Sequence, residues 1–222
     1  MTQEPSRLDV DDVRRRTMAT VILRRPTCDL VVLGSSQPSD LVIAEVMTVR
    51  RRGGGGAVLI APTETVWIDL WVPAMSPLAE SDVRHALLKA GAAFKTALEG
   101  AGAEGLEIIE TAQSGRGPAI CFDALGYGEL AIEGAKLLGL SAWRCRQGLL
   151  FQTAMYLREV PDIGPLVASL DRSTATSVVP LAELGLGGTT GRVLAEALLE
   201  VVARDEPAEL IESDPSLVAP PR

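Results

Sequence analysis

Residues 50–60 read RRRGGGGAVLI, so three arginines run directly into four glycines and an apolar segment. Glycines permit positive φ angles and a close approach of the backbone to a ligand, and their successive N–H groups can face an anion or a carbonyl. Side chains alternate along a strand, so one or two of the arginines point to the side of the glycine turn, where a guanidinium can hold a phosphate or carboxylate. The stretch predicts an anion-binding hairpin; the alternative is a flexible hairpin tip with solvated arginines.

The segments on both sides of this hairpin read as short strands with few helices between them. Helices are expected within 81–100 and 189–206, each preceded by Ser, Thr or Asp as a cap. Strands without regular βαβ alternation predict an α+β fold with a mixed, largely antiparallel sheet and packed helices. The expected strands are 18–25, 29–36, 48–52, 56–62, 65–73, 106–112, 119–124, 129–134, 135–144 and 148–160, while 38–47 reads as a short helix or a strand.

The segment 65–73, TVWIDLWVP, has the clearest strand pattern. Its even-numbered positions are aliphatic, and its odd-numbered positions carry two tryptophans and an aspartate between them. Because side chains on a strand alternate between the two faces of a sheet, one aliphatic face is expected, and the tryptophans and the aspartate are expected on the other.

The length of 222 residues and the 47% hydrophobic content suit one domain, which we place at 17–204. The polar segment 1–16 and the acidic, Pro-rich tail 205–222 are expected to be poorly ordered or lightly docked.

Charge and composition exclude several classes of function. The net charge of −8 argues against a nucleic-acid surface, and no apolar run has the roughly 18 residues that a membrane span needs. The cysteines, Cys28, Cys121 and Cys145, are odd in number, lack CxxC spacing and follow no signal peptide, which predicts reduced thiols in the cytoplasm. His85, the one histidine, excludes metal sites built on several imidazoles and reads as a helix-surface residue. No metal site is predicted.

Lys136 and Cys121 are the candidate chemical groups outside the hairpin. Lys136 begins the apolar strand LLGL, where a lysine gains nothing from burial without an anionic or carbonyl partner; the alternative is a snorkelling surface lysine. Cys121 lies in the apolar segment AICF, where a cysteine is either inert packing or a nucleophile whose thiolate a nearby cation favours.

Three segments in the same order carry a family resemblance. RRRGGGGAV at 50–58 resembles the arginine-arginine-x-serine-glycine-glycine-glycine-alanine-valine signature of the lipoate-protein ligase and octanoyltransferase superfamily, which shares its catalytic fold with biotin-protein ligases. LGSSQ at 33–37 resembles the glycine-x-x-glutamine element before it, and GELAIEGAKLLGLS at 128–141 resembles the acidic-leucine, hairpin and lysine-x-x-glycine segment. The resemblance spans roughly 30–158 and implies a biotin/lipoate protein ligase-like catalytic domain.

The resemblance implies roles for particular residues. Lys136 would hold the acyl carbonyl and, in a ligase, the adenylate, while Glu129 would lie near the nucleotide and Mg²⁺. The glycine loop and its arginine would line the tunnel for a lipoyl or octanoyl chain and neutralise the charge at its head. The implied substrate-binding residues are Gln37, Arg51, Gly54, Gly55, Gly56, Ala57, Gly139 and Ser141.

The chain departs from the family signature at five positions. Gly53 replaces the serine before the three glycines. Ile60 and Ala61 stand where a histidine-aspartate pair commonly follows, and Ala142 and Trp143 stand where glutamine and arginine are usual. These departures bear on substrate identity and on activity.

Three functions follow from the resemblance. The first is a ligase that uses ATP and Mg²⁺ to attach lipoate or octanoate, through an acyl-adenylate, to a lysine of a lipoyl acceptor domain. The second is an ATP-independent transferase, in which Cys121 takes an octanoyl group from an acyl carrier protein; the pair Cys121-Phe122 stands fifteen residues before Lys136, as in one octanoyltransferase branch. The third is a non-catalytic homologue that binds an acyl chain or a lipoyl domain.

Overall fold

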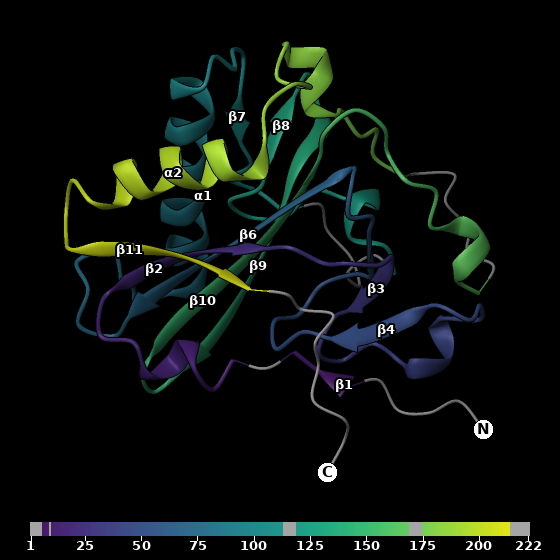
Figure 1. Cartoon of the computed structure of the whole chain (residues 1–222), viewed down its shortest axis with the longest axis horizontal. Coiled ribbons are helices and arrows are strands. Elements are labelled where there is room, and N and C mark those ends of the chain that lie inside the picture. The colour runs from purple at the N-terminus through teal and green to yellow at the C-terminus, as the bar shows by residue number, and fades with distance from the viewer. Residues whose placement is uncertain (1–5, 9, 113–118, 169–174, 214–222) are drawn as a thin grey trace.

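A computed structural model describes residues 6–8, 10–112, 119–168 and 175–213. Residues 1–5 and 9 of the predicted N-terminal segment and 214–222 of the predicted tail lie outside the described residues. Within the described part, the chain forms two sheets and two helices (Figure 1).

The larger sheet has seven strands and is antiparallel except at one edge. In spatial order it consists of β11 (Ala208–Ser213), β2 (Ala19–Arg24), β6 (Thr65–Pro73), β10 (Gly148–Tyr156), β9 (Ala135–Cys145), β8 (Leu130–Ile132) and β7 (Glu107–Ile108). Only β11 and β2 run parallel. The smaller sheet has the order β1 (Ser6–Arg7), β4 (Met47–Arg50), β3 (Leu30–Leu33) and β5 (Val58–Ile60). The mixed, largely antiparallel α+β prediction is confirmed.

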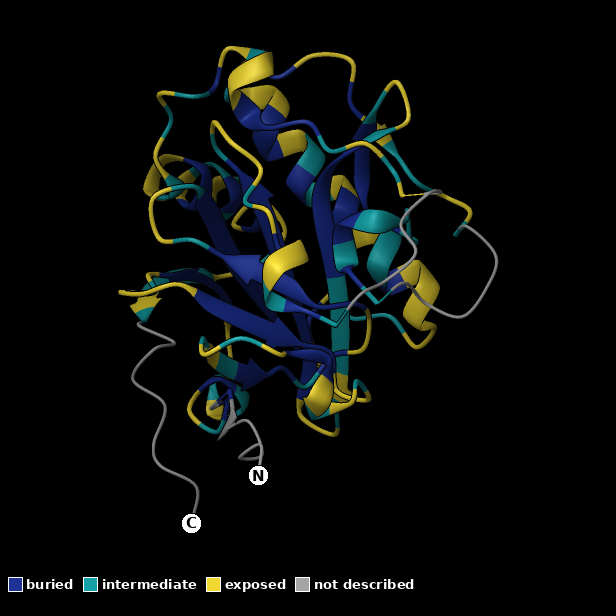
Figure 2. Cartoon of the chain, turned by 90° about the vertical axis from the view of Figure 1, so that its right-hand side faces the viewer, coloured by how far each residue is buried: buried dark blue, intermediate teal, exposed yellow. Residues whose placement is uncertain are grey.

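The two helices cover one face of the larger sheet. In α1 (Val83–Gly100), the Asp82 side chain accepts from the backbone N–H groups of Arg84 and His85, and in α2 (Gly191–Val202) Thr190 is the cap. Their apolar sides join a core with the aliphatic face of β6, as its alternation predicts. Figure 2 shows the buried residues concentrated in the strands and on the inward sides of the helices. Neither described helix is long and apolar enough to cross a membrane.

The opposite face of the larger sheet packs on the smaller one. Trp67 on β6 and Ala154 on β10 share a core cluster with Val32, Val58 and Ile60 of the smaller sheet. The connections between strands include five short 3₁₀ helices, at Val13–Arg15, Ser39–Leu41, Cys121–Asp123, Gly164–Leu166 and Leu181–Leu184. The site described below lies where the two sheets face each other.

Both predicted terminal segments contribute to the fold. Residues 208–213 form β11 and continue the larger sheet beyond β2, with Arg25 and Glu212 paired across the two strands. Near the N-terminus, β1 pairs with β4, and Leu8 and Val10 are buried. The charged residues of this segment suggested a loosely docked tail. They flank a short apolar pair, Leu210 and Ile211, and the backbone of this segment pairs with β2 at the edge of the sheet.

Candidate functional site

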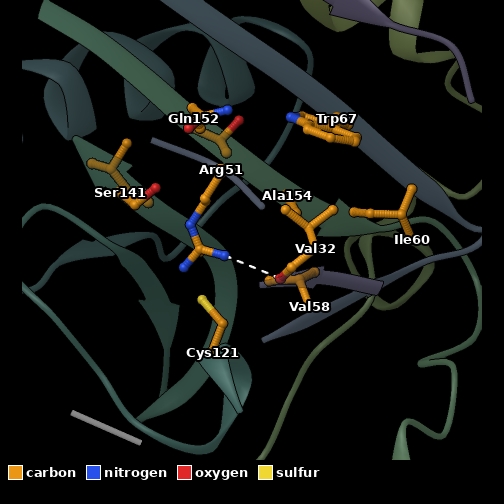
Figure 3. A pocket seen from close by; sticks show the side chains of 12 residues that line it. Val32, Arg51, Val58, Ile60, Trp67, Cys121, Ser141, Gln152 and Ala154 are labelled. Atoms are coloured by element: carbon orange, nitrogen blue, oxygen red, sulfur yellow. Dashed lines mark hydrogen bonds between the residues drawn. The ribbon is translucent and has the colours of Figure 1, made fainter. Parts of the chain in front are cut away.

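A narrow pocket lies between the two sheets and has an apolar and a polar part (Figure 3). Its cavity volume is about 30 Å³, room for roughly one or two water molecules, so an acyl chain requires neighbouring groups to move. The apolar part comprises Val32, Val58, Ile60, Trp67 and Ala154, and the rest of the lining comprises Arg51, Cys121, Gly139, Leu140, Ser141, Gln152 and Thr153.

Arg51 supplies a buried positive charge to this pocket. Its side chain donates to the carbonyls of Val32 at 3.2 Å, Gly54 at 2.7 and 3.1 Å, and Gly56 at 2.8 Å. It forms no ion pair within the described part of the chain, and burial lowers the pKa of its guanidinium, although Cys121 and two acids oppose this. A buried cation held only by carbonyl dipoles is suited to receive an anion.

Arg50 and Arg52 make contacts outside the pocket. Arg50 faces away from the pocket and donates to the carbonyls of Gly34 at 3.0 Å and Gln37 at 2.6 Å and to the Ser39 hydroxyl at 2.9 Å, so it fixes the loop after β3. Arg52 lies over the ring of Trp143, with 5.7 Å between the guanidinium carbon and the ring centroid. Of the three arginines, Arg51 alone lines the described pocket.

The backbone of the glycine loop packs directly against Gly34, at the end of β3, and against residues 141–142 of β9. A Cβ at Gly34 would lie 2.0 Å from the carbonyl oxygen of Gly55, which itself has φ +94°, so both positions require glycine. A Cβ at Gly53 would lie 3.0 Å from the Ser141 hydroxyl and 3.2 Å from the Ala142 carbonyl oxygen. This crowding gives a physical reason for glycine where the signature has serine.

Lys136 is buried behind the pocket in a complete hydrogen-bond shell. Its ammonium donates to Glu129 at 2.7 Å and to the carbonyls of Cys121 at 2.6 Å and Ala124 at 2.9 Å. Only about 1% of the Lys136 side chain is exposed, which excludes the surface alternative. Glu129 also accepts from the N–H groups of Gly126 and Leu140, so both its oxygens are occupied within the protein.

Cys121 connects Lys136 with the pocket. It begins a 3₁₀ helix instead of lying in the strand expected at 119–124, since the strand pairing ends in a single bridge between Ile120 and Ala57. Its sulfur is 3.8 Å from the Lys136 nitrogen and lines the pocket. A Cβ at Gly139 would lie 3.2 Å from this sulfur, so that glycine leaves room for the thiol.

The remaining residues singled out from the sequence lie outside the pocket lining. Gln37 lies outside the pocket lining: its side chain accepts from the Gly34 N–H at 2.9 Å and donates to the Ala119 carbonyl at 2.7 Å. Ala57 ties the loop to the Cys121 segment through two backbone hydrogen bonds. His85 is exposed on α1, away from the pocket lining. Among the described residues there is no cluster of three or more His, Cys, Asp or Glu that could hold a metal ion.

Most of the pocket lining was not predicted from sequence, and Trp67 and Gln152 are two of the missed residues. Trp67 was placed on the correct face of its strand, but nothing in the pattern indicated that this face borders a pocket. Gln152 interrupts the apolar run GLLF, and a long polar side chain inside a fully buried strand is the signal that identifies it.

Solved structures with the same fold were found, although no sequence match was. No protein-family model and no curated protein sequence matches this chain. In solved structures, lipoate-protein ligase A bound with ATP has a TM-score of 0.67 at 13% identity, covering 96% of this chain and 89% of that one. A bi-partite lipoate protein ligase of Thermoplasma acidophilum, described with its E2 lipoyl domain, has a TM-score of 0.63 at 14% identity, covering 96% and 88%.

A third structure, P. falciparum LipL1 in complex with lipoate, has a TM-score of 0.56 at 14% identity and covers 87% of this chain and 53% of that one. The chain has the α+β fold of the lipoate-protein ligases, and the fold implied by its sequence motifs is confirmed.

Proposed function

We propose that this protein attaches a lipoyl or octanoyl group to a lysine of a lipoyl acceptor domain. The observation that carries the proposal is the pocket: an apolar part between two sheets and, beside it, a buried Arg51 without an ion-pair partner among the described residues. This arrangement complements an acid with an apolar chain. The fold supports it, since structures with this fold include one bound with ATP and one in complex with lipoate.

In the ligase version, the acid's carboxylate attacks the α-phosphate of ATP and pyrophosphate leaves. The acceptor lysine amine then attacks the acyl carbon, loses a proton and releases AMP. Arg51 would hold the negative head during both steps. Lys136 would exchange one of its backbone carbonyl partners, Cys121 or Ala124, for the acyl oxygen, because all three of its N–H donors are now used. Mg²⁺ would arrive with the nucleotide.

The roles of Gly54, Gly55, Gly56, Ala57, Gly139 and Ser141 around the acyl chain, and of Gln37 in holding the loop, belong to the same proposal. A place for Glu129 beside the nucleotide stays a prediction, since its carboxylate is occupied by Lys136 and two N–H groups. A cytoplasmic setting, argued from the unpaired cysteines, also stays a prediction.

A second candidate is ATP-independent transfer, and one observation favours it. The Cys121 sulfur lines the pocket, and the Lys136 ammonium lies 3.8 Å from it. The thiolate would attack the thioester carbon of an octanoyl carrier protein and displace the carrier thiol. The acceptor lysine would then take the octanoyl group from Cys121.

The deciding experiment is the intact mass of an apo lipoyl acceptor domain after incubation with the protein. One arm contains lipoate or octanoate with ATP and Mg²⁺, and the other contains octanoyl carrier protein alone. Acceptor modification only in the first arm, kept by Cys121→Ala, supports the ligase. Modification only in the second arm, lost in Cys121→Ala and accompanied by an acylated wild-type enzyme, supports the transferase.

Failure of both arms, with an acceptor that another ligase modifies, would overturn the enzymatic proposal and leave a binding protein. In that case the acceptor should still bind, and the double variant Lys136→Met with Glu129→Gln, which leaves no buried unpaired charge, should not change its affinity.

A further inference from the structure

Gln152 is a buried amide in the pocket wall without hydrogen-bond partners. The residue is 5% exposed, and neither its Nε2 nor its Oε1 atom has a partner among the described residues. Figure 3 shows its side chain on the wall formed by the larger sheet, between Ser141 and Trp67. The apolar side chains Val32, Val58 and Ile60 of the smaller sheet face the same pocket.

The neighbours of Gln152 on the sheet are already engaged elsewhere. Asp69 lies opposite it on β6 and accepts from Arg24 Nε at 2.9 Å and from Trp67 Nε1 at 2.8 Å. Burial raises the pKa of Asp69, and Arg24, Trp67 and the Gln152 amide oppose this rise; the amide lies beside the carboxylate but outside hydrogen-bond geometry. Ser141 lies opposite Gln152 on β9, but no hydrogen bond joins the two side chains.

A buried primary amide without partners is costly, because it loses hydrogen bonds to water and gains none. A methionine or leucine at the same place would fill the space without this loss. The position of the amide, on the wall of a pocket and not within a packed core, means that a bound molecule can supply the missing partners.

We propose that this pocket selects a carboxylic acid whose chain carries its own hydrogen-bonding group, and that Gln152 is the residue that recognises this group. The inference rests on the proposed function and specifies its substrate class. Because Gln152 offers both a donor and an acceptor, a hydroxyl or an amide on the chain satisfies it best. An unsubstituted octanoyl chain leaves both atoms of the amide unpaired.

The test uses octanoate and a set of hydroxyoctanoates in which the hydroxyl moves along the chain from carbon 3 to carbon 8. Calorimetric affinities for the wild-type protein should show one position at which the hydroxy acid binds about tenfold or more tightly than octanoate. In Gln152→Met, which keeps the length of the side chain but has no amide, this preference should disappear while octanoate still binds.

A second readout distinguishes recognition from a structural role. Without ligand, Gln152→Met should unfold at the same or a higher temperature than the wild type, because it removes an unpaired amide. Gln37→Met is the matched control, since it removes an amide that is bonded on both sides and should lower the unfolding temperature.

Equal affinity of the wild-type protein for octanoate and every hydroxyoctanoate would overturn the inference, even if the variant does not fold. A drop in stability for Gln152→Met as large as that for Gln37→Met would overturn it too, because Gln152 would then be a structural partner of Asp69. These binding results are independent of acyl transfer. A Gln152-dependent preference without transfer would reject only the proposed function, and transfer of octanoate without any preference would reject only this inference.

Discussion

At the scale of single residues, the site is organised around buried charges of two kinds. Lys136 and Glu129 form a closed pair, with both side chains at most 5% exposed and every donor of the ammonium occupied. Arg51 is also buried but has only carbonyl partners among the described residues. The Lys136–Glu129 pair holds the surrounding backbone in place, whereas Arg51 keeps a positive charge that a ligand can neutralise.

Replacement of Lys136 should destabilise the protein through its partner. In Lys136→Met, Glu129 would be left charged and buried, which costs about 3–5 kcal/mol of unfolding free energy. In the double variant Lys136→Met with Glu129→Gln, the neutral amide can still accept from Leu140, so most of that loss should be recovered. Equilibrium urea unfolding measures both, and equal losses in the single and double variants would contradict the explanation.

The residues of the site could be predicted from sequence only where the residue type itself limits the possibilities. Arg51 and the glycines stood out because charge and conformational freedom are unusual inside a hairpin. The apolar strand around Lys136 made it a candidate, but only the structure excludes the surface alternative. Whether Arg50 or Arg51 faces the pocket could not be predicted, because a one-residue shift in register exchanges the faces. The position of Gln152 in the pocket wall depends on its neighbours on β6 and β9, so it could not be predicted from the local sequence.

At the scale of elements, α1 helps to position Glu129. A Cβ at Gly91, within the helix, would lie 2.1 Å from the carbonyl oxygen of Gly128, and a Cβ at Gly128 would lie 2.2 Å from that of Leu87. The helix therefore touches the residue before Glu129 backbone to backbone. Gly128 has φ +75°, a conformation that suits glycine.

This contact predicts opposite effects for two glycine substitutions in the same helix. Gly91→Ala should push α1 away from Gly128 and lower the unfolding free energy by about 1–3 kcal/mol, as in other overpacked sites. Gly100→Ala meets no atom within 4 Å and should be neutral or stabilising by up to about 1 kcal/mol. Chemical denaturation of both variants checks this; a destabilised Gly100→Ala or a neutral Gly91→Ala would show that the contact does not limit the helix.

Elements with a strong local signal matched the prediction, and those that depend on distant partners did not. The alternation in β6 and the caps of α1 and α2 act within a few residues. By contrast, β11 exists because its backbone pairs with β2, which lies at the other end of the chain. The Cys121 segment is similar, since its partner is the end of the glycine loop and not an adjacent strand.

At the scale of the whole molecule, the pocket lies at the interface of the two sheets. Trp67 and Ala154 come from the larger sheet, and Val32, Val58 and Ile60 come from the smaller one. A ligand in this pocket contacts both sheets at once. Its binding free energy should therefore stabilise the folded molecule as one cooperative unit.

Because a ligand contacts both sheets and faces the charge of Arg51, an acid should stabilise the fold more than an uncharged analogue. At a free concentration of 100 times its dissociation constant, an acid that binds only the folded state should raise the unfolding free energy by about 2.7 kcal/mol. Octanamide has the same chain but no negative charge, so at equal concentration it should stabilise much less, because Arg51 would stay on the carbonyls of Gly54 and Gly56. Urea unfolding with each compound measures the difference. Equal stabilisation by acid and amide would mean that the apolar wall alone binds the ligand and that Arg51 serves only to hold the glycine loop.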